Sequence, residues 1–294
     1  MRSPLSACFF FLRVCVPHLL FSCSGAVGLR GVTRSRCRRG SAASRGGRTF
    51  IMVLQHLDLL RRKRIVLASA SPRRREILEK VGLRHLEVCV SGFAENLPKA
   101  NFTCGGDYAL RTARHKAEDV VRQLQQRQQV VEVTDEKRNG FDPPPPFDIL
   151  IAADTVVTMP APDGGVVIIE KPATSEEAAA MLRRFAGTQH DVWSGVVLVV
   201  RDGSSSDRGG GGGLHWREVK VRTTVKFAPL AEEEIAAYVS NRRHWEGKAG
   251  GYGIQDAAAC LIAAIDGDYY NVMGLPLQAV CAELDEVIRD GVGR

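Results

Sequence analysis

The sequence predicts an α/β protein, and three observations support this. Two short apolar runs, residues 65–69 and 149–151, have the length and β-branched content of strands buried on both faces of a sheet. Such runs alternate with longer segments of helical periodicity, for example residues 108–124. Capping and turn signals separate the segments, as expected where strands and helices follow one another in one domain.

The first strand leads directly into a helix with a basic start. Ser71 offers an N-cap hydroxyl, and Pro72 suits the first helical position, where its missing N–H costs nothing. Arg73, Arg74 and Arg75 crowd the first turn, where the helix dipole already disfavours cations. A bound anion held by free N–H groups and a guanidinium explains this placement; a basic helix end lying in water is the alternative.

The next part of the chain adds a strand, a long helix and a polar segment. Residues 86–90 are predicted as a strand whose following turn carries Glu95, and residues 108–124 as a helix that carries Lys116. Residues 125–147 are polar and end in four prolines, so we predict a surface insertion there.

A second buried strand precedes an acidic residue. Residues 149–151 are apolar, and Asp154 is expected at the carboxyl end of this strand, the edge where α/β sheets bind ligands. A carboxylate there either caps a turn or serves a function, and both interpretations stay open. Residues 166–169 return as a strand that leads into Glu170 and Lys171.

The remaining elements follow in order along the chain. We predict a helix at 178–185 opened by a Thr174 and Glu177 capping box, a hairpin of strands 190–200 and 216–227 around a Ser/Gly loop, a helix at 231–239, a glycine-dense loop at 247–255, a strand at 261–265 and a closing helix at 275–288. Glycine in the loop permits close approach to a ligand, but it also simply permits turns.

Charged and polar residues collect at the strand ends, on one helix and in the glycine loop. Carboxylates hold a hard cation, while Lys and Arg neutralise phosphate oxygens, so this mixture suits a metal–polyphosphate site. The sequence has no G-x-x-x-x-G-K-[ST] and no G-x-S-x-G. The residues concerned are Arg73, Glu95, Lys116, Asp154, Glu170, Lys171, Lys248 and Gln255.

The basic residues are unevenly distributed. Nine of the 40 basic residues and none of the 33 acidic ones lie in residues 1–52, so the remainder has 31 basic against 33 acidic side chains. The folded part is therefore not basic, and no nucleic-acid partner is predicted. The cysteines show no C-x-x-C or paired His spacing, which argues against a zinc site or a disulfide framework.

Residues 1–52 are predicted to be a leader outside the fold, and residues 53–294 to form one domain. The leader's apolar run is too short and interrupted for a membrane span. It has features of a secretory signal and of an organellar presequence; a third interpretation is that Met52 is the working start. We favour the third, because the first strand begins so soon after Met52, and it predicts a cytoplasmic protein.

Six motifs in order resemble the Maf-like nucleotide pyrophosphatases, most of all the Maf-like domain that vertebrates fuse to a methyltransferase-like domain. They span about residues 64–284 and comprise S-A-S-P-R-R (69–74), A-R-H-K-A (113–117), A-D-T-V-V (153–157), E-K-P (170–172), K-A-G-G-Y-G-I-Q (248–255) and V-M-G-L-P-L (272–277). The resemblance implies an elongated mixed sheet with helices on both sides and two lobes around a nucleotide cleft. It also implies hydrolysis of a nucleoside triphosphate to the monophosphate and pyrophosphate with Mg²⁺ or Mn²⁺.

The resemblance further implies roles for individual residues. Asp154 matches the catalytic acid–base residue, and Glu95, Asp154 and Glu170 are the expected metal ligands. Ser69, Lys116, Lys171 and Lys248 are expected to contact the substrate. The expected partner is the nucleotide, with no membrane involved, and a homodimer stays open.

Three positions that sort substrates within the family are Arg73, Thr155 and Gln255. The branch that acts on 7-methyl-GTP has Trp, Gln and Glu there, so this sequence is similar to the branch that takes dTTP and UTP. The alternative is a non-catalytic nucleotide-binding module of the same fold.

The sequence departs from the family pattern at three positions. Gly247 stands where relatives often have Asp, and Asp256 where many have Gly, which changes the glycine loop. Ala94 replaces the first acid of an acidic pair, so Glu95 is left alone and weaker metal binding is expected.

Overall fold

The computed structural model describes residues 53–133, 145–162, 164–202 and 213–291. The predicted leader, residues 203–212 of the loop between the two hairpin strands and residues 134–144 of the predicted insertion lie outside these residues. The helices are α1 (Leu57–Leu60), α2 (Pro72–Lys80), α3 (Gly105–Val133), α4 (Ser175–Phe185), α5 (Glu232–Ser240), α6 (Arg242–Trp245), α7 (Tyr269–Met273) and α8 (Leu277–Arg289). Short 3₁₀ turns are η1 (Val53–His56), η2 (Lys99–Asn101), η4 (Ala249–Gly251) and η5 (Ala257–Leu261).

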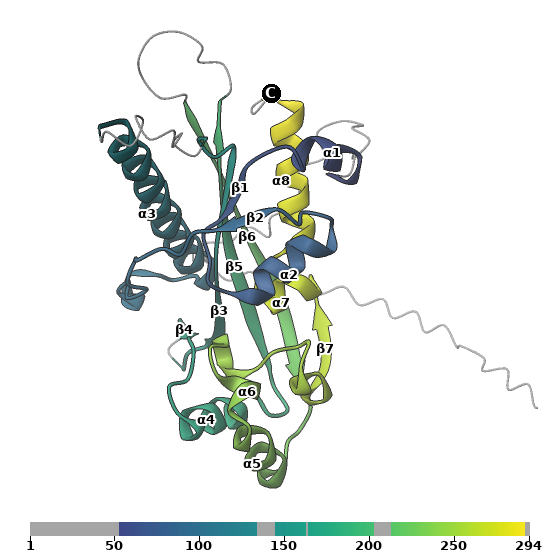
Figure 1. The fold of residues 1–294 in the computed structure, drawn as a ribbon. Coiled ribbons are helices and arrows are strands. Elements are labelled where there is room, and N and C mark those ends of the chain that lie inside the picture. Colours follow the sequence, from purple (N-terminus) through teal and green to yellow (C-terminus); the bar gives the residue numbers. More distant parts are fainter. Residues whose placement is uncertain (1–52, 134–144, 163, 203–212, 292–294) are drawn as a thin grey trace, which may run out of the picture. The chain divides into compact units, whose positions relative to one another are not determined.

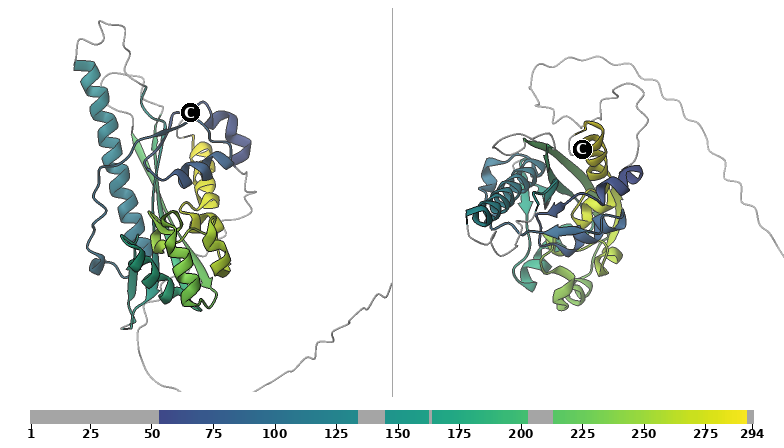
Figure 2. Two further views of the ribbon diagram at one scale, coloured as in Figure 1. Left: turned by 60° about the horizontal axis from the view of Figure 1, so that its bottom comes forward. Right: turned by 45° about the horizontal axis from the view of Figure 1, so that its top comes forward.

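The strands of the described residues form one seven-stranded mixed sheet, which confirms the predicted fold class. Its order is β2-β1-β3-β5-β6-β7, with β4 paired to β3 as a branch. The strands are β1 (Ile65–Leu67), β2 (Leu86–Val88), β3 (Ile149–Pro160), β4 (Val166–Ile169), β5 (Gln189–Arg201), β6 (Leu214–Phe227) and β7 (Ile262–Asp266). Helix α3 covers one face, while α2, α7 and α8 lie on the other (Figures 1 and 2).

Strand β3 lies at the centre of the site. Its pairing with neighbouring strands is interrupted on one side. On one side it pairs with β5 from residue 149 to 158. On the other side, its first residues pair in parallel with β1, as far as Ile151, and its last residues pair with β4, from Val157 onward. Within the described residues no strand pairs with residues 152–156 on that side. The sheet is therefore open there, beside Asp154.

Two apolar cores lie on either side of this opening. One gathers β1, α2 and α8 with the first half of β3, and includes Leu67, Ile151 and Leu284. The other gathers α4, α5 and α6 with the second half of β3, and includes Phe185 and Trp245. The two predicted lobes correspond to these cores, which share the long strands of the sheet.

The structure corrects three of the sequence predictions. Residues 125–133 are not an insertion but the last turns of α3, because the glutamine-rich stretch has a good helix propensity although it lacks an apolar period. Asp154 lies in the middle of β3, not at its end, because the strand continues to Pro160 by pairing with β4. Ser71 is the N-cap residue of α2, but its hydroxyl makes no capping hydrogen bond.

Helix α3 lies unusually close to the sheet. Its buried face carries alanines at helical spacing, Ala109, Ala113 and Ala117, which are all fully buried. Beneath them, Gly195 of β5 is paired with Asp154. A Cβ atom on Gly195 would lie 2.2 Å from the backbone N of Leu110, so only glycine admits the helix at this distance.

We therefore predict that Gly195→Ala lowers the free energy of unfolding by at least about 2 kcal/mol, because the clash is with helix backbone that cannot rotate away. Chemical denaturation measures this value. The control is Gly213→Ala, whose new Cβ would meet nothing closer than His215 Nε2 at 3.9 Å. Equal stability of the two variants would contradict the packing described above.

Candidate active site

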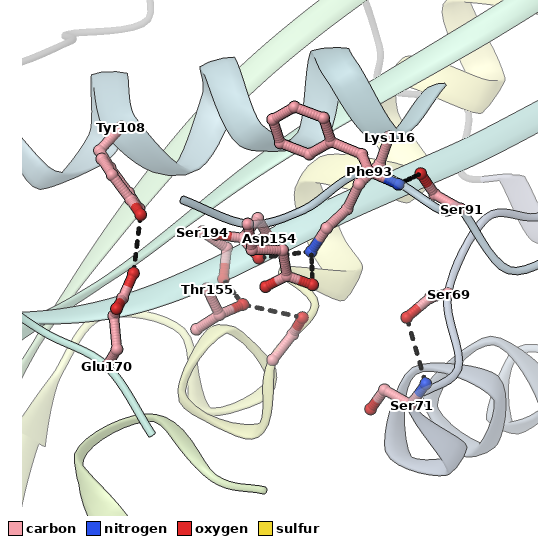
Figure 3. Close-up of polar contacts among 12 residues, drawn as sticks. Ser69, Ser71, Ser91, Phe93, Tyr108, Lys116, Asp154, Thr155, Glu170 and Ser194 are labelled. Carbon is pink, nitrogen blue, oxygen red and sulfur yellow. Dashed lines mark hydrogen bonds and ion pairs between the residues drawn. The ribbon is translucent and has the colours of Figure 1, made fainter. Parts of the chain in front are cut away.

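The turn between β1 and α2 is shaped by the Ser69 hydroxyl rather than by Ser71. Ser69 is buried, and its Oγ accepts a hydrogen bond from the Ser71 backbone N–H at 3.2 Å (Figure 3). Pro72 occupies the first helical position, as predicted. The turn brings the first residues of α2 to the edge of the opening beside β3.

Arg74 is a partly buried cation of this turn. Its Nε donates to the Gly274 carbonyl at 2.9 Å, one Nη donates to Ser69 Oγ at 2.9 Å, and the other lies 3.4 Å from Thr155 Oγ1. Burial lowers the pKa of Arg74, and the charges of Asp154 and Glu95 oppose that change. Within the described residues no carboxylate oxygen lies within 4.0 Å of it. A partly buried cation whose hydrogen-bond partners are all neutral is suited to binding an anion.

Arg73, which the sequence pointed to, is placed differently. It is partly buried, as Arg74 is, but its one hydrogen bond in the described residues is a long one, 3.5 Å to the Gly247 carbonyl across the opening. It lines the same cleft as Arg74. Burial lowers the pKa of Arg73 as well, against the charge of Asp256.

Asp154 is held by a lysine from α3. The carboxylate is 6% exposed, and Lys116 Nζ donates to its Oδ1 at 2.8 Å. Figure 3 shows the Lys116 side chain pointing from the helix toward Asp154 on β3. Burial raises the pKa of Asp154 above its ordinary value, although Lys116 and Arg74 act in the opposite direction. A carboxylate with a raised pKa is a better proton acceptor than an exposed one.

Glu95 shares the same ammonium group. Its Oε1 lies 2.8 Å from Lys116 Nζ, and its Oε2 lies 3.7 Å from Lys171 Nζ. Burial alone would raise the pKa of Glu95, but the charges of Lys116, Lys171 and Arg74 outweigh it, so the pKa lies below the ordinary value. Glu95 thus stays ionised, and two carboxylates converge on one point.

Glu170 has other partners. Tyr108 on α3 donates its hydroxyl to Glu170 Oε1 at 2.7 Å, as Figure 3 shows, and Lys99 lies 2.7 Å from Oε2. Burial, together with this hydrogen bond, raises the pKa of Tyr108, so the hydroxyl stays a donor. Both oxygens of Glu170 are therefore engaged away from Lys116.

Lys248 does not reach the opening. Its Nζ donates to the carbonyls of Arg243 and His244 at 2.6 and 2.8 Å and pairs with Asp256 at 2.8 Å. Three oxygens satisfy the three donors of an ammonium group. The structure therefore gives Lys248 the place of an anchor for the loop that follows it, and not of a substrate contact.

Gln255 does reach the opening. Its Oε1 is buried and has no hydrogen-bond partner within the described residues. Gln255 lines the cleft of about 420 Å³ that also contains Ser69, Arg73, Arg74, Glu95, Lys116, Asp154, Thr155 and Lys171. A neighbouring hollow of about 300 Å³ shares Asp154 and Glu95 and reaches Tyr108 and Glu170. The cleft thus brings together all the sequence-predicted site residues except Lys248, with Glu170 beside it.

Comparison with known proteins identifies the fold and the motifs. The Maf-like protein family matches residues 64–287. The chain belongs to the Maf-like protein family. This confirms the predicted family.

Several curated Maf-like relatives are similar over most of the chain. It is 40% identical over 227 residues to a human "probable bifunctional dTTP/UTP pyrophosphatase/methyltransferase protein", an alignment that covers 76% of this chain and 32% of the relative. It is 35% identical over 235 residues to a dTTP/UTP pyrophosphatase of Schizosaccharomyces pombe, covering 79% and 87%. A dTTP/UTP pyrophosphatase of Nitrobacter winogradskyi is 35% identical over 228 residues, covering 76% and 91%. The chain thus spans about a third of the human protein and most of the other two.

The Maf-like site contains functional candidates that sequence reasoning did not select. Arg74 stood inside the S-A-S-P-R-R motif, but nothing in the sequence distinguishes it from the neighbouring Arg73 and Arg75. Tyr108 and Ser194 were missed as well. Ser194 lies opposite Thr155 on β5, and the two hydroxyls are 2.8 Å apart (Figure 3). Only the strand register reveals such a pair.

Fewer candidate metal ligands lie together in this Maf-like site than the sequence predicts. Among the described residues no group of three His, Cys, Asp or Glu side chains is close enough to hold a metal ion. Glu95 and Asp154 nevertheless bring two hard oxygen donors to one ammonium, and Mg²⁺ commonly binds one or two carboxylates together with substrate phosphates. These two residues fit a divalent cation of that kind. No described helix has both the length and the apolar character needed to cross a membrane.

We predict that Arg74→Met abolishes anion binding while changing the melting temperature of the free protein by only a few degrees. The substitution removes three hydrogen bonds, but it also removes a partly buried charge that no carboxylate of the described residues contacts. Differential scanning fluorimetry with and without pyrophosphate tests both parts. At about 100 times Kd the ligand should stabilise the unchanged protein by about 2.7 kcal/mol and the variant by nothing.

The matched control for this experiment is Arg75→Met. Arg75 lies on the same turn but is exposed and paired with Glu79 at 2.8 Å. Its variant should respond to pyrophosphate as the unchanged protein does. A normal response of Arg74→Met would show that Arg74 is not the anion-binding group.

Proposed function

We propose that this protein is a nucleoside triphosphate pyrophosphatase that hydrolyses dTTP and UTP to the monophosphate and pyrophosphate. The observation that carries the proposal is the partly buried Arg74 guanidinium without a carboxylate within 4.0 Å among the described residues, beside the Asp154–Lys116–Glu95 group. The Arg74 guanidinium needs an anion, and the Asp154–Lys116–Glu95 group supplies a proton acceptor and negatively charged oxygens. The names of the Maf-like relatives support the same reaction and substrates.

In this proposal each residue acts on the polyphosphate from its observed place. Arg74 holds phosphate oxygens from the buried side, and Arg73 and Lys171 approach from the more exposed side. Asp154, whose pKa is raised by burial, accepts the proton of the water that attacks the α-phosphorus. Lys116 keeps Asp154 and Glu95 oriented, and pyrophosphate leaves.

A divalent cation, Mg²⁺ or Mn²⁺, belongs to the proposal. Glu95 and Asp154 would hold it, and it would supply charge neutralisation of the phosphate oxygens when bound. Glu170 is expected to remain with Tyr108 and Lys99, because both its oxygens already have partners. The same carboxylates could also serve a module that binds nucleotides without turnover, so the reaction itself must be tested.

We predict that UTP with Mg²⁺ gives UMP and pyrophosphate, and that Asp154→Asn reduces kcat by about 10²–10⁴-fold while UTP still binds, because the proton acceptor is lost but the cations remain. Chromatographic separation of the products and calorimetric titration measure the two effects. EDTA should stop turnover by the unchanged protein. Release of UDP and orthophosphate would contradict the mechanism. Binding of UTP with no turnover by the unchanged protein would favour the non-catalytic module.

Base selection is proposed to depend on Gln255. Its unpartnered Oε1 can accept a hydrogen bond from the N3–H of uracil or thymine, and its amide N–H can donate to the adjacent carbonyl. The Thr155 hydroxyl is already bound to Ser194, to the Gly274 carbonyl and weakly to Arg74. Thr155 therefore contributes by holding Arg74 and α7 in place.

We predict that Gln255→Glu lowers kcat/KM for dTTP and UTP by at least about tenfold, since a carboxylate cannot donate to the pyrimidine carbonyl. The free energy of unfolding should change by less than about 1 kcal/mol. The measurement compares dTTP, UTP, 7-methyl-GTP and ITP on one preparation, with Gln278→Glu on the exposed face of α8 as the control. A preference of the unchanged protein for 7-methyl-GTP or ITP would overturn the choice of base but not the reaction.

A further inference from the structure

The wall of the cleft that carries Gln255 is the glycine-rich loop of residues 247–255, which contains the short 3₁₀ turn η4. Gly250 and Gly251 have φ values of +71° and +72°, which glycine adopts readily. The Gly250 N–H donates to the Glu170 carbonyl at 2.9 Å, and the Gly251 N–H donates to the Lys248 carbonyl at 3.0 Å. Glycines lose more conformational freedom on ordering than other residues, so side chains must hold this loop.

One of the side chains that hold it is Tyr252, between the paired glycines and Gln255. Its hydroxyl lies 2.7 Å from His190 Nε2, on β5. Both residues are buried, with 5% of Tyr252 and 2% of His190 exposed. The other ring nitrogen of His190, Nδ1, has no partner within the described residues. Among the described residues, this is therefore the one hydrogen bond between the His190 ring and the loop.

Aromatic rings surround this hydrogen bond. The Phe185 centroid lies 4.2 Å from that of His190, and the Phe227 centroid lies 5.1 Å from that of Tyr252. Burial lowers the pKa of His190 to about 4, so the ring is uncharged at neutral pH. In such surroundings a hydrogen bond is strong, and its loss leaves a buried polar atom unpaired.

We propose that the His190–Tyr252 hydrogen bond fixes the cleft face of residues 247–255 and thereby sets how strictly Gln255 selects a pyrimidine. The proposal rests on the proposed function of this cleft. Tyr252 itself lines the cleft, whereas His190 acts through it and is a positioning residue. The anchor at Lys248 holds the loop before the glycines, and Tyr252 holds it after them.

The two ends of the hydrogen bond can be removed without emptying the core. Tyr252→Phe keeps the ring and deletes the hydroxyl, and His190→Phe keeps an aromatic ring and deletes its hydrogen-bond partner. If the bond acts as a unit, the double variant should be no worse than either single variant, because the second change removes nothing further. The control is Phe227→Leu, which loosens the same aromatic cluster but takes no hydrogen bond from the loop.

Two measurements test the proposal, hydrogen exchange of residues 247–255 and the ratio of kcat/KM for UTP to that for ITP. We expect each single variant to exchange about tenfold faster in the loop and to lose about tenfold in the ratio, with the double variant the same. Phe227→Leu should melt earlier but keep the ratio. An unchanged ratio in Tyr252→Phe, or an equal loss of ratio in Phe227→Leu, would overturn the proposal by showing that the cluster is merely structural.

The exchange experiment separates this proposal from the proposed function. If the unchanged protein hydrolyses no nucleotide, the proposed function fails, and exchange in Tyr252→Phe still decides whether His190 holds the loop. If the unchanged protein is active but exchange in the loop is the same in all variants, the proposal fails alone.

Discussion

The structure depends on keeping a carboxylate in the middle of a buried strand. Asp154 is 6% exposed in a strand whose neighbours are almost entirely apolar. Burying an ionised carboxylate is very costly unless a cation and hydrogen bonds compensate it. Lys116 supplies that cation, and the requirement that it reach Asp154 explains why α3 must approach β5 so closely over Gly195 and its own row of alanines.

The charges of the two cations around Asp154 are neutralised to different degrees. This difference determines where in the site an anion should bind. Lys116 has two carboxylates at 2.8 Å and is neutralised within the protein. Arg74 has only hydroxyls and a carbonyl at hydrogen-bond distance. An entering anion therefore gains more from Arg74 than from Lys116. Phosphate oxygens should gather at the start of α2, which leaves Asp154 free to act on the reacting atom.

The sequence predicted helices and strands well where a clear apolar pattern marks them. It predicted their boundaries poorly where strand pairing determines them. All seven strands were predicted close to their observed places, since short apolar runs and turn signals mark them. The length of β3 was not, because its second half exists only through its pairing with β4 and β5. The end of α3 was missed because a run of glutamines has a good helix propensity but no apolar period.

The site was predictable as a set of residues but not as a set of contacts. Charge type and motif order predicted one site for a set of residues that line one cleft in the structure, namely Asp154, Glu95, Lys116 and Gln255. Charge type and motif order did not distinguish Lys248 from Lys171. The Lys248 ammonium pairs with Asp256 within its own loop, whereas the Lys171 ammonium is largely exposed beside Glu95. Three neighbouring arginines likewise differ in their hydrogen-bond partners, which depend on how α2 meets the Gly274 carbonyl. Tertiary position, rather than residue type, decides which cation faces the ligand.

The unusual residues of the glycine loop are consistent with this division between anchoring and binding groups. Gly247 has φ of +66°, a conformation that an aspartate adopts only with strain, so glycine suits the backbone observed here. The carboxylate that Gly247 lacks is provided by Asp256, which pairs with Lys248 at 2.8 Å. With Lys248 held at one end of the glycines and Tyr252 at the other, the loop keeps a defined wall. A loop that is fixed at both ends can present Gln255 to a base without being ordered by that base first.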